Sequence, residues 1–289
     1  MRRSPRWFVA AALRLVVMGV VAGAALSAQG PPAGQAPGRG GAGAPPGPAP
    51  SPQQLAPQNL SLTGYWVSII NEDWRWRMVT PPPGDFVSLP LNPEGQRVGQ
   101  QFTPQQDGSC LAYGMAGLMR MPIRVHITWQ DPQTLKIESD AGQQTRLLYF
   151  DASKAPTTAS PQGRSVAQWE SPARGRGGPG GGGPGGGRGG PPPPPTAQPF
   201  GTLKVTTTNL TPGWLRRNGA PYSEQATVDE YFDNIDSTNQ DKWLIVTTTV
   251  RDPKFLNADY ITSSHFKREA PAEGPRPKNW LSTPCKPAA

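Results

Sequence analysis

Residues 121–150 read MPIRVHITWQDPQTLKIESDAGQQTRLLYF, and this stretch decides the fold class. Along its first part apolar side chains alternate with polar ones, with Met121, Ile123, Val125, Ile127 and Trp129 on one face and Arg124, His126 and Thr128 on the other. This period of two predicts a strand with one buried face. Short turns at residues 131–133 and 140–142 separate two further strands, at 134–139 and 144–150. Such short turns make neighbouring strands antiparallel, so we expect a three-stranded meander.

The same pattern continues towards the C-terminus. We expect further strands at residues 165–170, 201–209, 226–235, 243–251 and 260–267. Together with the segment before residue 80 this makes about nine or ten consecutive strands with closely spaced turns. The sequence therefore predicts an all-β fold, either an antiparallel up-and-down β-barrel or a sandwich. One short helix is expected after Asn92-Pro93-Glu94, where an N-cap residue precedes a proline and an acid.

Residues 62–80, LTGYWVSIINEDWRWRMVT, hold several aromatic side chains. From 72 to 79 the residues alternate, with Glu72, Trp74, Trp76 and Met78 on one face and Asp73, Arg75, Arg77 and Val79 on the other. We interpret this segment as a strand whose tryptophan face belongs to the core.

The N-terminus has the features of an export signal. Residues 1–28 combine an arginine-rich start with an apolar run and small residues near Ala28, which predicts a cleaved signal peptide and a periplasmic or secreted protein. The alternative is an uncleaved membrane anchor, which Arg14 makes less favourable. Without the four arginines of this segment the formal charge falls from +8 to +4. No basic stripe then remains on a folded element, so a nucleic-acid partner is not expected.

The 34 glycines and 37 prolines are concentrated in two tracts. We expect residues 29–58 to be a disordered linker and residues 171–199 to be a disordered insert within a single barrel-like domain at 59–289. The insert is rich in Arg, Gly and Pro, which could indicate an RNA contact or a ligand of SH3-type domains. Export favours the simpler interpretation, an expanded low-complexity loop.

Cys110 and Cys285 are the two cysteines of the chain. In an oxidising compartment an even pair predicts a disulfide bond. Metal binding by the two thiols is the alternative, and no CxxC motif or neighbouring histidine supports it.

Motifs for catalysis or cofactors are sparse. The chain lacks a G-x-S-x-G motif, and its two histidines, His126 and His265, are too few for a three-histidine zinc site. The two histidines together with Glu138 or Glu170 stay open as a metal site. We predict no catalytic residue, no metal and no cofactor.

Charged residues at mid-strand positions offer a candidate binding site. On an open sheet they face water, whereas in a small closed barrel one strand face lines an interior that can hold a ligand. Arginine next to tryptophan would suit an anionic or aromatic ligand. On this hypothesis the ligand-binding residues are Arg75, Arg77, Arg124, His126 and Arg146.

Several segments resemble an uncharacterised family of exported bacterial proteins: residues 62–66, 72–78, 126–129, 165–170, 217–223 and 262–266. The resemblance spans roughly residues 60–285. It implies a β-rich, barrel-like body similar to lipocalins and no established activity.

Three hypotheses about function follow. The first is a non-catalytic exported barrel that binds a small hydrophobic or anionic ligand. The second is a structural or protein-interaction module of the cell envelope, with a partner that the sequence does not name. The third is a hydrolase or isomerase that uses His126 or His265 with a carboxylate.

Overall fold

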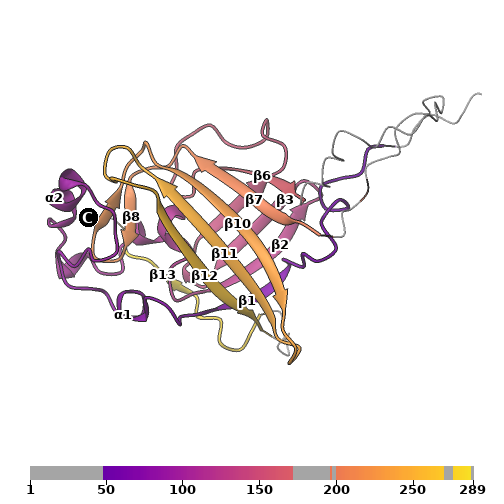
Figure 1. The fold of residues 1–289 in the computed structure, drawn as a ribbon, viewed down its shortest axis with the longest axis horizontal. Helices are drawn as coiled ribbons and strands as arrows, with labels where there is room; N and C mark the ends of the chain where they lie inside the picture. Colours follow the sequence, from indigo (N-terminus) through magenta and orange to yellow (C-terminus); the bar gives the residue numbers. More distant parts are fainter. Residues whose placement is uncertain (1–47, 172–195, 197–199, 270–275, 288–289) are drawn as a thin grey trace, which may run out of the picture. The chain divides into compact units, whose positions relative to one another are not determined.

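Nine strands close into a β-barrel in the computed structural model, which describes residues 48–171, 196, 200–269 and 276–287 (Figure 1). Around the barrel the strands follow one another as β1 (Gly64–Ile69), β12 (Tyr260–Arg268), β11 (Lys242–Arg251), β10 (Thr227–Asp236), β7 (Thr202–Thr208), β6 (Arg164–Glu170), β5 (Thr145–Tyr149), β3 (Thr134–Ser139) and β2 (Arg124–Asp131). The predicted all-β fold is confirmed, and the barrel rather than the sandwich is the form it takes. The expected signal peptide, the linker up to residue 47 and nearly all of the expected insert lie outside the described residues.

One pair of neighbours departs from the antiparallel prediction. β5 and β6 run parallel and share only two residue pairs, Leu148 with Ser165 and Tyr149 with Val166. Parallel neighbours require a connection of about a dozen residues or more, and residues 150–163 provide it. The barrel is therefore mixed, and the β5–β6 seam is its shortest ladder of paired residues.

The strand predicted at residues 72–79 is wrong. The chain forms the short helix α1 (Trp74–Arg77), which begins after Asp73 at a φ of 53°. β12 continues to Tyr260 beyond its last pair with β1, but the chain turns away from it. The helical turn satisfies its own backbone groups, because the amides of Trp76 and Arg77 donate to the carbonyl of Asp73. Trp74 is 63% exposed, so it does not belong to the core as expected.

Short elements cover the barrel end next to α1. They are α2 (Pro93–Gly99), η1 (Pro104–Gln106), η2 (Cys110–Tyr113), α3 (Met115–Leu118), β8 (Gly213–Arg216) and β9 (Ala220–Tyr222). The predicted helix is α2, and the side chain of Asn92 accepts a hydrogen bond from the Gly95 amide at 2.8 Å, as expected for an N-cap. Apolar residues of these elements pack on barrel residues such as Val228 and Val250. None of the helices in the described ranges is long and apolar enough to cross a membrane.

Side chains fill the barrel interior. Inward side chains from all nine strands contribute to one apolar cluster, whose members include Trp66, Val125, Ile127, Leu135, Ile137, Leu148, Ala167, Leu203, Val205, Phe232, Leu244, Val246 and Phe266. Phe150, Trp129 and Trp169 pack against this cluster and contact one another. Trp169 Nε1 also donates to the carbonyl of Pro52 at 2.8 Å, so part of the segment predicted to be a linker lies against the barrel.

A buried ion pair interrupts the apolar interior. Arg146 of β5 is 1% exposed and its Nη2 lies 2.5 Å from Oε2 of Glu230 of β10, which is fully buried. Arg146 also donates to the hydroxyls of Ser165 in β6 and Thr207 in β7, at 3.2 and 3.1 Å. Burial raises the pKa of the Glu230 carboxyl, and Arg146 opposes that rise. One guanidinium thus connects β5 to three other strands and reinforces the short β5–β6 seam.

The predicted disulfide between Cys110 and Cys285 is present, with the two Cα atoms 4.9 Å apart. It joins η2 to the C-terminal segment, where β13 (Thr283–Pro284) pairs in parallel with β4 (Ala141–Gly142). The bond therefore ties the last described residues to the body of the protein.

Removing one partner of the Arg146–Glu230 ion pair should lower the free energy of unfolding more than removing both partners. Arg146→Met or Glu230→Leu leaves one buried charge unpaired and should lower the free energy of unfolding by about 3–5 kcal/mol. The double variant should recover most of that loss. Urea denaturation measures the three values, with Arg97→Met as a control, because Arg97 forms an exposed pair with Glu94 and its loss should not change the result. A double variant as unstable as the sum of the single ones would contradict this account.

Removing the disulfide should also destabilise the protein. The bond closes a loop with a sequence separation of 175 residues, and a Cys110→Ser/Cys285→Ser variant should lose about 2–5 kcal/mol because its unfolded chain gains conformational freedom. Thermal unfolding with and without reductant tests this. The reductant should lower the Tm of the wild type to that of the variant and leave the variant unchanged.

Candidate functional site

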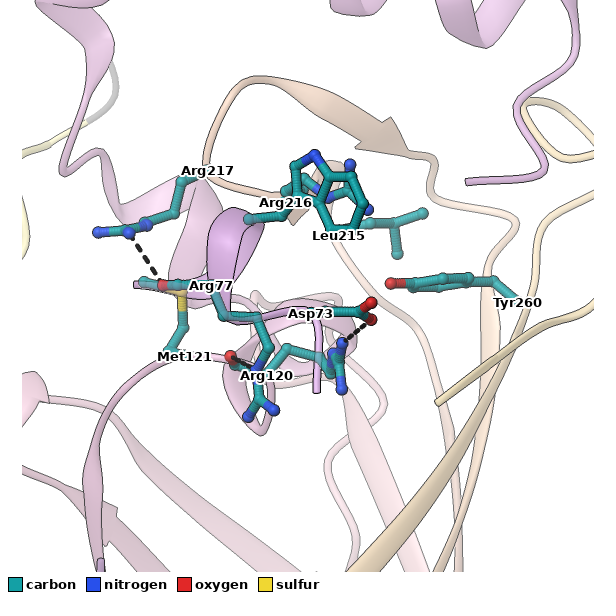
Figure 2. Close-up of a pocket in the computed structure, with 9 residues that line it drawn as sticks. Asp73, Arg77, Arg120, Met121, Leu215, Arg216, Arg217 and Tyr260 are labelled. Carbon is teal, nitrogen blue, oxygen red and sulfur yellow. Dashed lines mark hydrogen bonds and ion pairs between the residues drawn. The ribbon is translucent and has the colours of Figure 1, made fainter. Parts of the chain in front are cut away.

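The elements α1 and β8 lie towards the same end of the barrel (Figure 1). Residues of both line a cleft there. Its inner pocket is narrow, with a volume of about 20 Å³, and is lined by residues of α1, of β8 and of the loop before β2 (Figure 2). Its outer pocket has a volume of about 420 Å³ and extends along the start of β12. Because Asp73, Arg120 and Tyr260 line both pockets, we treat them as one rim cleft.

Positive charge dominates the rim cleft and its edge. Five arginines gather here, namely Arg75, Arg77, Arg120, Arg216 and Arg217. They face three carboxylates, namely Glu72, Asp73 and Asp85. The excess of arginine favours an anion over a cation at this end of the barrel.

Arg77 is the most deeply placed of these arginines. Its side chain is 4% exposed, its Nε donates to the carbonyl of Arg120 at 2.9 Å, and its Nη1 lies 3.4 Å from Glu72 Oε1. Desolvation, helped by repulsion from Arg120, lowers the pKa of Arg77 to about 10, so it stays charged at neutral pH. Within the described part of the chain, its Nη2 is buried and has no hydrogen-bond partner.

Arg217 lies next to Arg77. Its Nη2 donates to the main-chain carbonyl of Arg77 at 2.9 Å (Figure 2). Its Nε is buried, and no described residue accepts a hydrogen bond from it. The two neighbouring arginines therefore carry two buried N–H groups that need an acceptor.

Arg120 connects the two pockets. Its Nη2 forms an ion pair with Asp73 Oδ2 at 2.5 Å, and its Nη1 donates to the carbonyl of Ser263 at 2.9 Å. These contacts fix α1 and the start of β12 relative to each other. The carbonyl of Arg120 also accepts a hydrogen bond from Arg77 Nε, which completes a chain of contacts from Arg217 through Arg77 and Arg120 to Asp73.

Trp76 provides the aromatic wall of the inner pocket. The guanidinium carbons of Arg75 and Arg216 each lie 5.2 Å from its ring centroid, and its Nε1 donates to Asp85 at 3.0 Å. Arg216 is held by the carbonyls of Asp85 and Val87, and desolvation lowers its pKa. The two cation–π contacts and the hydrogen bond to Asp85 hold the Trp76 side chain in position.

His265 and Ser263 project from the outer face of β12 into the outer pocket. His265 Nδ1 lies 3.2 Å from Asn71 Oδ1 and 3.3 Å from Glu72 Oε2. Its Nε2 lies 3.4 Å from the hydroxyl of Ser263. A histidine, a carboxylate and a hydroxyl are thus in line beside the arginines.

The five residues proposed from the sequence are divided among three places. Arg77 lines the rim cleft, and Arg75 lies at its edge, 3.6 Å from Asp85. Arg124 and His126 point outward from β2, where Arg124 pairs with Glu269 at 3.0 Å. Arg146 points into the filled interior. The structure therefore does not bring these five residues together in one site inside the barrel.

His126 is covered on the barrel wall. Its ring stacks on Tyr65 with centroids 3.9 Å apart, Trp280 approaches at 6.5 Å, and Glu138 lies 3.5 Å from its Nδ1. Burial lowers the pKa of His126, and Glu138 opposes that shift.

The sequence pattern did not point to Arg120, Arg216, Arg217 or Tyr260. Each stands beside a turn or at a strand end, where periodicity carries no information. One feature of the sequence could have pointed to Arg216 and Arg217. They are two adjacent charged residues between the apolar pair Trp214 and Leu215, which is buried, and the turn at Asn218-Gly219.

Among the described residues no group of three or more His, Cys, Asp or Glu side chains could hold a metal ion. Comparison of the chain with protein-family models, with curated proteins and with solved structures gave no match. These comparisons identify no family. The structure shows the barrel that the resemblance implied.

The lowered pKa of His126 predicts a pH dependence of stability. The folded state binds the proton less tightly than the unfolded state, so stability is complete above the ordinary histidine pKa of about 6.5 and declines as pH falls below it. Urea midpoints of wild type and His126→Gln between pH 7.5 and 5 measure this. As the pH falls, the urea midpoint of the wild type should decrease relative to that of His126→Gln. Midpoints that change in parallel for the two proteins would contradict the prediction.

Proposed function

We propose that the protein is exported and binds a small organic anion in the rim cleft. The charged group of the ligand enters the inner pocket towards Arg77 and Arg217, and the rest of the molecule occupies the outer pocket. Of the ligand classes considered from the sequence, hydrophobic or anionic, the arginines favour the anionic one.

The observation that carries this proposal is the pair of buried N–H donors without acceptors, Arg77 Nη2 and Arg217 Nε. A buried donor that lacks a partner costs about 1–3 kcal/mol, and more when it is charged. Carboxylate or phosphate oxygens would remove that cost through charge-assisted hydrogen bonds.

The dimensions of the cleft agree with a small ligand. A volume of about 20 Å³ in the inner pocket exceeds the roughly 10–15 Å³ that one water needs, so the pocket suits one charged group and not a whole molecule. The outer pocket, at about 420 Å³, lies in the range of small-molecule sites, roughly 300–1,000 Å³. Trp76, Met121 and Leu215 provide apolar surface beside the charges.

Export is supported by the signal-like N-terminus and by the disulfide. Disulfides persist mainly in oxidising compartments, such as the periplasm or the medium. The Cys110–Cys285 bond is consistent with such a location.

A second candidate function is a protein-interaction module. It is favoured by the filled barrel interior and by three exposed apolar side chains on and after α1: Trp74, Met78 and Val79 are 63%, 52% and 65% exposed. Neighbouring exposed apolar side chains can mark a contact surface. The arginine cluster distinguishes the two, because an interaction surface does not require buried donors without acceptors.

Native mass spectrometry of the full mature protein, purified without added anions, should reveal a co-purifying small molecule. Calorimetry with benzoate and with inorganic phosphate then tests binding directly. Arg217→Gln should weaken binding by about tenfold or more, because a hydrogen bond to a charged group contributes about 1.5–3 kcal/mol.

Arg97→Gln is the matched control for this experiment. Arg97 lies in α2, and its side chain is 61% exposed. Among the described residues its guanidinium forms an ion pair with Glu94 alone. The control should bind as the wild type does, and the Tm of both variants should lie well above the temperature of the binding measurement, so that both are folded. If neither anion binds and no molecule co-purifies, the anion-binding proposal is overturned and the interaction module becomes the better account.

A further inference from the structure

The outer pocket contains a serine, a histidine and two acceptors in the arrangement that acyl-transfer enzymes use. Ser263 and His265 are two residues apart on β12, so both side chains point to the outer face of the barrel. Asn71 and Glu72 come from the segment between β1 and α1 and meet His265 from the other side. All four line the outer pocket.

The surroundings of His265 determine which nitrogen carries the proton. Its Nδ1 faces two acceptors, Asn71 Oδ1 at 3.2 Å and Glu72 Oε2 at 3.3 Å. The neutral ring therefore carries its hydrogen on Nδ1 and keeps a lone pair on Nε2. The hydroxyl of Ser263, 3.4 Å from Nε2, must then be the donor in that contact. This is the orientation that a general base needs towards a nucleophile.

Glu72 is poised to stabilise a protonated His265. Its Oε2 is buried and has no hydrogen bond to any described residue, while its Oε1 lies 3.4 Å from Arg77 Nη1. A proton gained by His265 would convert the 3.3 Å contact with Glu72 into a charged pair. Glu72 and Asn71 are thus positioning residues for the histidine.

Arg120 supplies positive charge next to the serine. Its Nη1 donates to the main-chain carbonyl of Ser263 at 2.9 Å, so the guanidinium is held at the residue that carries the hydroxyl. Negative charge that develops on a substrate oxygen at Ser263 would be stabilised by this cation.

We propose that Ser263 and His265 hydrolyse esters of small anionic molecules in the outer pocket. Ser263 Oγ attacks the ester carbonyl carbon and gives its proton to His265 Nε2. The C–O bond to the alcohol breaks, and the alcohol leaves with that proton. Water then gives a proton to His265 Nε2 and attacks the acyl carbon. The bond between that carbon and Ser263 Oγ breaks, and His265 returns the proton to Oγ. The net reaction consumes an ester and water and yields an acid and an alcohol.

The anionic character of the substrate rests on the proposed function of the inner pocket, whereas the nucleophile does not. A neutral ester therefore tests Ser263 alone, and an anionic ester tests both. This separation allows either proposal to fail without the other.

His126 provides a matched control within the same chain. It also pairs with a carboxylate, Glu138, at 3.5 Å from its Nδ1. It lies on the barrel wall, stacked on Tyr65 and approached by Trp280, and not in the rim cleft. A reaction that merely needs a surface histidine would depend on His126 as much as on His265.

The first experiment treats the oxidised full mature protein with a fluorophosphonate probe and maps the adduct. We expect one adduct, on Ser263, which Ser263→Ala and His265→Gln abolish and His126→Gln retains. Turnover of p-nitrophenyl acetate should fall at least about 100-fold in the first two variants and stay unchanged in the third. No adduct on Ser263 in the folded wild type overturns the proposal, as does equal labelling of wild type and His265→Gln.

Two further measurements complete the test. If Ser263→Ala does not fold, judged by its Tm, His265→Gln decides the question. Glu72→Gln should lower kcat and leave KM nearly unchanged, because a histidine that is no longer held in position slows the chemical step, whereas a general loss of pocket structure would also raise KM. Adduct formation without binding of benzoate or phosphate would remove the anion-binding proposal and keep this one.

Discussion

The ion pair between Arg146 and Glu230 is the interaction on which the barrel depends. Glu230 lies on the inner face of β10 between Val228 and Phe232, which belong to two separate apolar clusters. The pair therefore forms a polar layer in the middle of an apolar interior. It occurs where Arg146 can also reach the hydroxyl of Ser165 across the parallel β5–β6 seam. A buried charge is costly, and here the cost is opposed by the contacts of Arg146 with Ser165, Thr207 and Glu230.

A filled interior has a direct consequence for function. In a barrel of this size the inward side chains leave no need for a ligand to complete the core, and the binding chemistry lies at the rim instead. The chain leaves the barrel after β1, forms α1 and places Trp76 and Arg77 against residues of β8. Four segments that are far apart in the sequence contribute to one cleft. The cysteines of the disulfide do not line this cleft, and their bond holds the C-terminal segment.

The fold was largely predictable, and the site was not. Residues 121–150 alternate so regularly that their strands and inward faces follow from periodicity, and Asn92 is recognisable as an N-cap. The alternation at residues 72–79 was misleading, because a period of two over one short segment does not ensure a neighbouring strand. Arg146 was assigned to a ligand because a charged residue on an inward face looks like a binding residue until Glu230 is known to lie opposite.

By itself the sequence determined the positions of most strands, the side of each strand that is buried and the pairing of its two cysteines. These follow from side-chain periodicity and from the small number of possible partners. Only the tertiary structure decided that the sheet closes, that β5 and β6 run parallel and that five arginines gather at one rim. The reason is physical: closure and charge clustering depend on contacts between residues more than a hundred positions apart, such as Arg120 with Ser263, and local patterning does not encode them.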